Sequence, residues 1–138
     1  MTDCLFAYGS LQPGCAPAEI ASVAAKLRPL GAGFVRGALY DLGRYPGAVP
    51  DGHANSRIAG SVLQLPRDTA ILRLLDEYEG FSPQAPEQSE FVRERLLVEM
   101  AAGGTIECWI YRYNRRPDAA LEVKGDESMV ARWNSKAE

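Results

Sequence analysis

Two short segments of the chain carry residues that could do chemistry. The first is Tyr8-Gly9-Ser10-Leu11, which follows a short apolar run and precedes Gln12-Pro13-Gly14. A strand that ends in Gly-Ser and then turns at Pro-Gly leaves backbone N–H groups without partners at its tip. Such groups can hold a carboxylate or stabilise a developing oxyanion. The alternative is that Gly9-Ser10 forms an ordinary turn with no chemical role.

The second segment, Leu75-Asp76-Glu77-Tyr78-Glu79-Gly80, closes a predicted helix and is rich in acid. At about 100° per residue, the apolar face holds Ile71, Leu74, Leu75 and Tyr78. Glu79 falls at the edge of this face, Glu77 falls on the opposite side, and Asp76 lies between them. We therefore interpret Glu77 as a solvated surface charge and Glu79 as a carboxylate held against the core.

Two effects would act on Glu79 in the same direction. Partial burial disfavours its anion, and the negative partial charge of a helix C-terminus disfavours it again. Both raise the pKa of Glu79 toward the range that is useful for proton transfer. Gly80 fits a left-handed residue that ends the helix. The alternative is that the side chain of Glu79 reaches water from the helix end.

The overall composition is that of an ordinary soluble domain. With 138 residues, we expect a single domain over residues 1–138. The net charge of −3 and the scattered Lys and Arg residues argue against a nucleic-acid binder. The chain starts without the basic and apolar pattern of a signal peptide, and no apolar run approaches membrane-spanning length. We therefore expect a cytoplasmic protein that does not bind membranes.

The cysteines and the single histidine argue against a metal site or a disulfide framework. The three cysteines are odd in number and form no C-x-x-C pair. With one histidine and no dense carboxylate cluster, we expect no transition-metal site. Cys4 and Cys108 lie in apolar strands and should be buried, whereas Cys15 follows a glycine. Because only His53 could activate Cys15, a Cys–His nucleophile pair is a remote alternative.

The elements that must position these residues follow from hydrophobic periodicity. Helices are expected over Ala16–Leu27, ended by Pro29 and Gly31, and over Pro66–Tyr78. Strands are expected over residues 3–8, 33–42, 58–65, 91–100 and 105–113, with a short extended piece at Ala48-Val49. Gly37, in the middle of a strand, indicates a bulge or a close backbone approach. Strands and helices do not alternate regularly, which favours an α+β fold with a mixed, mostly antiparallel sheet, able to curl into a small barrel.

The order of these motifs resembles the γ-glutamylcyclotransferase-like family, including its γ-glutamylamine cyclotransferase and AIG2-like branch. The resemblance covers residues 4–115 and rests on the order and spacing of several motifs. Those motifs are Phe6-Ala7-Tyr8-Gly9-Ser10-Leu11, the segment 37–47 with its Tyr45-Pro46-Gly47 loop, Gly60-Ser61-Val62, Leu75-Asp76-Glu77-Tyr78-Glu79-Gly80, Phe91-Val92-Arg93 and Cys108-Trp109-Ile110-Tyr111. The chain departs from several family members at Phe91, where they carry tyrosine.

The resemblance implies a small β-barrel flanked by helices and an intramolecular cyclisation that releases 5-oxoproline from a γ-glutamyl compound. It implies that Glu79 is the catalytic acid/base and that the reaction requires no metal or cofactor. The substrate-binding residues implied are Tyr8, Gly9, Ser10, Leu11, Tyr45 and Tyr111. The released amine, amino acid or specialised metabolite stays open, as does the oligomeric state. Two other functions also stay open for this fold, namely small-acid binding without turnover and protein–protein interaction through an exposed apolar patch.

Overall fold

The structure is a computed structural model that describes residues 3–12 and 16–123. Its strands are β1 (Cys4–Ala7), β2 (Arg28–Asp41), β3 (Pro46–Pro50), β4 (Arg57–Gln64), β5 (Phe91–Met100) and β6 (Thr105–Tyr113). Its α-helices are α1 (Ala21–Ala24) and α2 (Thr69–Glu79), and the 3₁₀ helices are η1 (Pro86–Gln88) and η2 (Ala119–Leu121). None of the helices in the described ranges is both long and apolar enough to span a membrane.

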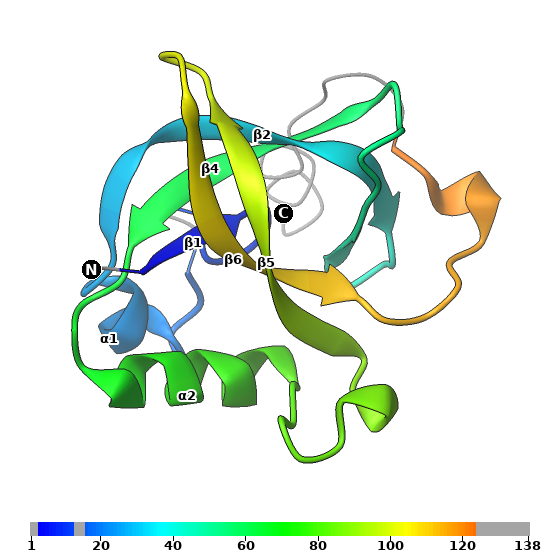
Figure 1. Ribbon diagram of the computed structural model, residues 1–138. Coiled ribbons are helices and arrows are strands. Elements are labelled where there is room, and N and C mark those ends of the chain that lie inside the picture. Colours follow the sequence, from blue (N-terminus) through cyan, green and yellow to red (C-terminus); the bar gives the residue numbers. More distant parts are fainter. Residues whose placement is uncertain (1–2, 13–15, 124–138) are drawn as a thin grey trace.

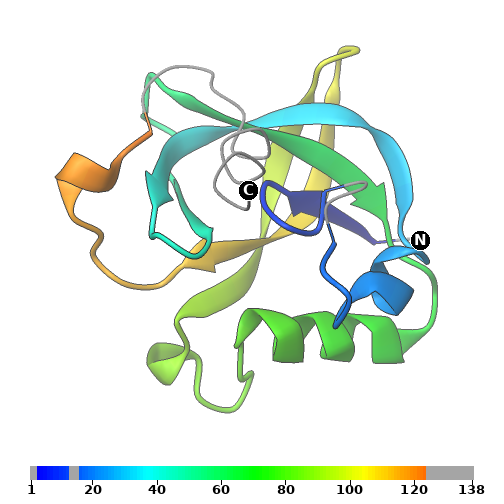
Figure 2. The ribbon, with the colours of Figure 1, turned by 180° about the vertical axis from the view of Figure 1, so that it is seen from behind.

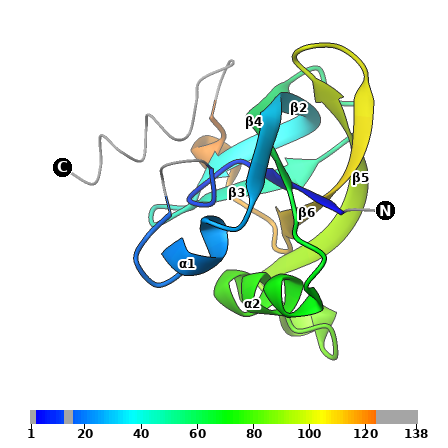
Figure 3. The same ribbon diagram turned by 90° about the vertical axis from the view of Figure 1, so that its left-hand side faces the viewer.

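The strands form a closed barrel. Their order is β3-β2-β4-β1-β6-β5, and a further pairing of β2 with β5 closes five of them, with β3 extending from β2. Only the β1–β6 pair is parallel among the strand pairs of the described residues, and the others are antiparallel. Both α-helices lie on the same side of the barrel (Figures 1 and 3). The predicted α+β class, with a mixed and mostly antiparallel barrel flanked by helices, is confirmed.

Strand β1 is buried on both of its faces because it separates two hydrophobic clusters. Alternate side chains of a strand point to opposite faces. Phe6 therefore packs inside the barrel with Val62, Val98 and Ile110. Leu5 points outward, into a cluster that joins the barrel wall to the two α-helices. In the view from behind, both helices lie below the barrel, with α1 next to α2 (Figure 2).

Helix α2 begins at Thr69, later than the predicted start at Pro66, and ends at Glu79, one residue beyond the predicted end. The Asp68 side chain accepts a hydrogen bond from the N–H of Ala70 at 3.0 Å, which caps the first turn. Gly80 ends the helix in the left-handed conformation, at a φ of 75°, as predicted.

The predicted position of the core face of α2 was partly wrong, because Leu74 is 40% exposed. The buried face is instead rotated toward Asp76 and Glu79, so both acids point at the barrel.

The prediction for the segment after β1 was wrong in extent. The expected helix over Ala16–Leu27 is reduced to α1, one turn long, with turns on either side. Ile20, Val23 and Leu27, whose spacing suggested a helix, are still buried, and short turns bring them into the core. Strand β2 already begins at Arg28, so Pro29 and Gly31 lie within it, at a register shift against β4. A proline without an N–H is tolerated at such an irregularity. The short extended piece at residues 48–49 is the full strand β3.

Gly37 lies where β2 and β3 approach closely, as its position in the strand predicted. Its φ is +151°, and a Cβ there would lie 2.5 Å from the carbonyl oxygen of Val49 and 2.8 Å from Cα of Pro50.

We expect Gly37→Ala to lower the free energy of unfolding by about 2 kcal/mol or more, because the backbone must shift. Urea denaturation measures this change. Gly52→Ala is the matched control, since nothing lies within 4 Å of a Cβ there, and an equal loss in both variants would contradict this explanation.

Candidate active site

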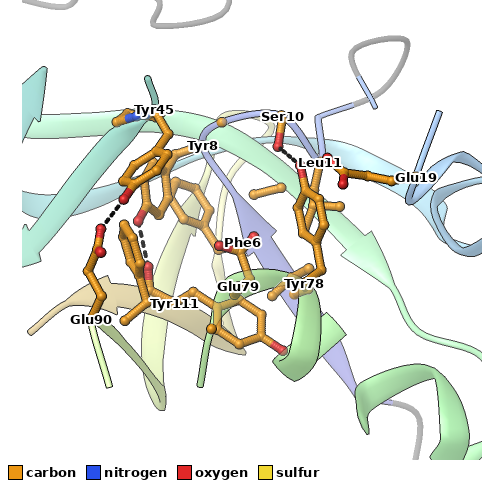
Figure 4. A pocket seen from close by; sticks show the side chains of 16 residues that line it. Phe6, Tyr8, Ser10, Leu11, Glu19, Tyr45, Tyr78, Glu79, Glu90 and Tyr111 are labelled. Carbon is orange, nitrogen blue, oxygen red and sulfur yellow. Dashed lines mark hydrogen bonds between the residues drawn. The ribbon is translucent and has the colours of Figure 1, made fainter. Parts of the chain in front are cut away.

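A cavity of about 380 Å³ lies where the tip of β1 meets the C-terminal end of α2 (Figure 4). A volume of this size is typical of small-molecule pockets. Every residue that the sequence suggested for the site lies in its wall: Tyr8, Gly9, Ser10, Leu11, Tyr45, Glu79 and Tyr111. The segment directly after β1 supplies Tyr8, Gly9, Ser10 and Leu11, and α2 and β6 supply Glu79 and Tyr111, so the barrel and the helix together form the pocket.

Glu79 lies in the last turn of α2, and its side chain extends between Phe6 and Tyr78 (Figure 4). The residue is partly buried. Burial raises the pKa of its carboxyl group to about 7. The direction agrees with the sequence prediction, and of the two causes expected, burial is the one that the structure identifies. A carboxyl group with such a pKa can both accept and donate a proton near neutral pH.

Three tyrosines close to Glu79 have their hydroxyl groups bonded elsewhere. The Tyr8 hydroxyl donates to the carbonyl oxygen of Tyr111 at 2.5 Å and accepts from the N–H of Ala48 at 3.2 Å. The Tyr78 hydroxyl bonds to Oγ of Ser10 at 2.7 Å. The Tyr111 hydroxyl donates to Oδ1 of Asp76 at 2.7 Å. Burial is the main cause that raises the pKa of each tyrosine, and the nearby Glu79 charge raises it further.

The Glu79 carboxylate, by contrast, is left without such partners in the described part of the chain. Among the described residues, no hydrogen bond and no ion pair reaches it. A buried carboxylate without donors is unstable as the anion, which explains why its pKa is raised. The same lack of partners leaves its oxygens available to a bound molecule that carries N–H groups. The site is therefore suited to a substrate with an ammonium or amide group.

Asp76, one turn before Glu79, is a buried acid whose importance the sequence did not reveal. It is 6% exposed, and Arg93 holds it with both ends of its guanidinium group, Nε at 2.8 Å from Oδ1 and Nη2 at 3.2 Å from Oδ2. The guanidinium lies over the Trp109 ring, 4.3 Å from its centre. The helical position of Asp76 hinted at burial, but nothing local to the helix identifies Arg93 of β5 as its partner.

The other end of the cavity is formed by Tyr45, Glu90 and Phe91. The Tyr45 hydroxyl donates to Oε1 of Glu90, and this bond is the main cause that raises the pKa of Tyr45 to about 12. Phe91 packs edge-on against Tyr45 with ring centres 5.6 Å apart, so its apolar ring holds the pocket tyrosine. Sequence reasoning missed Glu90 and the exposed Glu19. The charged residues of the described pocket wall are all acidic: Glu19, Glu79 and Glu90.

Residues 9–12 form a turn, and Gly9, Ser10 and Leu11 of this turn line the pocket, so a chemical role for the turn stays a prediction. The N–H of Gln12 donates to the carbonyl oxygen of Gly9 at 3.1 Å, which closes the turn. Pro46 packs against Gly9, where a Cβ would lie 3.1 Å from its Cγ. The turn and loop hydrogen bonds found within the described ranges include none donated by the N–H groups of Ser10 and Leu11. These two groups are therefore candidate donors to a ligand.

The cysteine alternatives can be assessed in part. Cys4 and Cys108 are free and buried, as expected, and burial is the main cause that raises the pKa of both thiols. Cys15 lies outside the described residues, so the pairing of Cys15 with His53 stays an untested alternative. Within the described ranges, no group of three or more His, Cys, Asp or Glu residues is placed to hold a metal ion.

Comparison with known proteins identifies the family. A family model described as "Gamma-glutamyl cyclotransferase, AIG2-like" matches residues 5–134. The chain belongs to this family. This confirms the resemblance found in the sequence motifs. None of the curated protein sequences compared with the chain matches it.

Solved structures of low sequence identity share the fold of this family member. Bacillus subtilis YkqA has a TM-score of 0.70 at 19% identity, and the match covers 100% of this chain but 44% of YkqA. A mouse AIG2-like protein has a TM-score of 0.67 at 19% identity, with 91% and 87% of the two chains covered. A structure called gamma-glutamyl cyclotransferase has a TM-score of 0.57 at 16% identity, covering 82% and 67%. The chain thus spans less than half of YkqA.

The raised pKa of Glu79 has a measurable effect on stability. Because the folded-state pKa of about 7 exceeds the ordinary value near 4.5, the folded protein holds a proton that the unfolded chain loses in this interval. Stability contributed by Glu79 is complete below about pH 4.5 and is lost as the pH rises through 7. We expect Glu79→Gln to be more stable than wild type by about 2 kcal/mol at pH 8, and by much less at pH 5.

Urea denaturation at both pH values measures this difference. Glu77→Gln is the control, because Glu77 is an exposed acid of the same helix. A stability gain of Glu79→Gln that does not grow between pH 5 and pH 8 would show that Glu79 is ionised in the folded protein at low pH.

Proposed function

We propose that this protein is a cyclotransferase that releases 5-oxoproline and an amine or amino acid from γ-glutamyl compounds. The observation that carries the proposal is the position of Glu79, a buried carboxyl group without donors that shares one cavity with the loop over residues 9–11. Membership of the γ-glutamyl cyclotransferase family supports the reaction class. The solved structures are too distant in sequence to support more than the fold.

In the proposed reaction, the α-amine of the substrate attacks its own γ-carbonyl carbon and closes a five-membered ring. Glu79 first takes a proton from the α-ammonium group, which frees the amine lone pair. The new C–N bond forms and the bond from the γ-carbon to the leaving nitrogen breaks. Glu79 returns the first proton to that nitrogen, and the second proton, which the ring nitrogen loses on becoming a lactam N–H, also passes to the released amine, which leaves as an ammonium ion. No water is consumed, and the step needs no metal or cofactor. Because the attack is intramolecular, the protein mainly has to hold the folded rotamer.

The remaining pocket residues would bind and orient the glutamyl part. We assign the N–H groups of Ser10 and Leu11 to the negative charge of the substrate, either its α-carboxylate or the oxyanion that develops at the γ-carbonyl. Tyr8 and Tyr111 would form one wall, since the Tyr8 hydroxyl is held by the carbonyl oxygen of Tyr111 and the Tyr111 hydroxyl is held by Asp76. Tyr45, bonded to Glu90, would lie beside Tyr8 on this side, and Ser10 and Tyr78 would form the opposite wall (Figure 4).

Two other functions of the same fold make different predictions. A binding protein would retain a γ-glutamyl compound without releasing 5-oxoproline. A protein-interaction module would be expected to have its pocket plugged by side chains and to expose a large apolar patch. The open cavity argues against the second alternative.

The activity is tested with a panel of γ-glutamyl amines, γ-glutamyl amino acids and γ-glutamyl derivatives of larger amines, with 5-oxoproline as the measured product. For the best substrate, we expect Glu79→Gln to lower kcat by about 10²-fold or more, because the proton shuttle is lost. Glu77→Gln should keep wild-type kcat. Near-full turnover by Glu79→Gln would disprove the assignment of Glu79, and absence of 5-oxoproline with every substrate would disprove the reaction.

The pH dependence provides an independent prediction. As the general base, Glu79 must be ionised in the free enzyme, so kcat/KM should fall as the pH drops below about 7. The bound α-ammonium group stabilises the carboxylate, so the corresponding midpoint in kcat should lie at lower pH. Initial rates between pH 5 and pH 9 measure both profiles. A kcat/KM that does not change between pH 5 and pH 7 would contradict this role.

A further inference from the structure

Asp76 is the most buried acid near the pocket, and the proposed reaction does not use it. It lies one helical turn before Glu79 on α2 and is absent from the described wall of the cavity. Its carboxylate accepts two hydrogen bonds from Arg93 and one from the Tyr111 hydroxyl. A buried acid with this many partners, so close to the proposed acid/base, needs an explanation beyond stability.

We propose that Asp76, fixed by Arg93, is a positioning residue that keeps the Tyr111 hydroxyl away from the carboxylate of Glu79. This inference rests on the proposed function for its meaning, because it explains how the acid/base keeps its oxygens unoccupied. The contacts on which it depends do not require that function.

The first step of the argument is competition for one proton donor. Tyr111 lies in the cavity wall, and its hydroxyl is close enough to both acids that each charge acts on its pKa, which burial raises first. A buried phenol must donate to some acceptor, and the charges of Asp76 and Glu79 both act on this one. In the structure the hydroxyl donates to Asp76. If it turned to Glu79, it would occupy an oxygen that the substrate ammonium needs.

The second step is that Arg93 makes Asp76 the stronger acceptor. Arg93 holds both oxygens of Asp76 in fixed positions, and a carboxylate forms stronger hydrogen bonds than a neutral carboxyl group does. Glu79 has a raised pKa and is therefore partly neutral near pH 7. The guanidinium of Arg93 is itself held over the rings of Trp109 and Phe81, 4.3 and 5.6 Å from their centres. These ring contacts hold Arg93 in place, and Arg93 in turn holds the Asp76 carboxylate.

The third step is charge balance. Arg93 and Asp76 together carry no net charge, so this pair adds little field at Glu79, whose raised pKa is caused by burial. The other titratable groups that line the cavity are Tyr78, which precedes Glu79 on α2, and five groups from other parts of the chain: Tyr8, Glu19, Tyr45, Glu90 and Tyr111. Apart from Tyr111, these groups are unchanged in the variants below. Differences in the titration of Glu79 therefore report on Asp76 and Tyr111.

The test is a titration of Glu79 by NMR, with glutamate carbon-13-labelled at the side-chain carboxyl and Glu79→Gln used to assign the resonance. In Asp76→Asn, the neutral amide oxygen is a weaker acceptor for the Tyr111 hydroxyl than the carboxylate was, and it no longer neutralises the charge of Arg93, so both effects stabilise the Glu79 carboxylate. We expect the midpoint of Glu79 to fall by about 1 pH unit. In Asp76→Asn/Tyr111→Phe the hydroxyl is absent, so part of that decrease should disappear. Tyr111→Phe alone should leave the midpoint unchanged.

The contrary outcomes are distinct. An unchanged midpoint in Asp76→Asn, or an equal decrease with and without the Tyr111 hydroxyl, would overturn the proposal. If Asp76→Asn does not fold, Tyr111→Phe still decides, since a rise of the Glu79 midpoint would show that the hydroxyl serves Glu79 in the wild type. The titration does not depend on turnover, so a protein without cyclotransferase activity can still confirm or overturn this inference. For an active enzyme, the acid limb of kcat/KM in Asp76→Asn should move to lower pH by the same amount.

Discussion

The site depends on one carboxyl group that is buried without a hydrogen-bond donor. Burying a charge is costly unless partners compensate it, and proteins usually supply those partners. Here the end of α2 brings Glu79 against the barrel, while the nearby hydroxyls of Tyr8, Tyr78 and Tyr111 are bonded to other acceptors. The raised pKa of Glu79 follows from this arrangement. The buried Glu79 carboxyl group lowers the stability of the folded protein, and the packing of the rest of the fold offsets this loss.

The barrel is what makes this arrangement rigid. Strand β1 is buried on both faces and delivers Tyr8 and the following loop to the cavity. The parallel pairing of β1 with β6 brings Tyr111 next to Tyr8, and their hydrogen bond links the two strands beyond the ladder. Helix α2 packs its buried face on the outside of these strands and ends at the cavity. The positions of loop, tyrosines and acid are therefore fixed by core packing, with little freedom left to the loop itself.

Much of this site could be predicted from the sequence because its main parts are local. The loop after β1 follows from a strand that ends in Gly9-Ser10, and the orientation of Glu79 follows from helical spacing that ends at Gly80. Partnerships across the sheet could not be predicted in the same way. Arg93 reaches Asp76 from β5, so the pair becomes visible only when the barrel is closed. The acids Glu19 and Glu90 were missed because they join the cavity from separate elements.

The errors in the predicted elements have a common physical cause, which is tertiary packing that overrides local pattern. The segment before β2 has helical spacing, yet only one turn is helical, because barrel closure extends β2 back to Arg28. Leu74 was assigned to the core, but the helix is rotated so that Asp76 and Glu79 face the barrel instead. Leu74 is thereby left exposed, while Asp76 and Glu79 point inward. Hydrophobic burial alone would favour the opposite rotation, so the Asp76–Arg93 pair and the Tyr111 hydrogen bond must contribute to setting the orientation of α2.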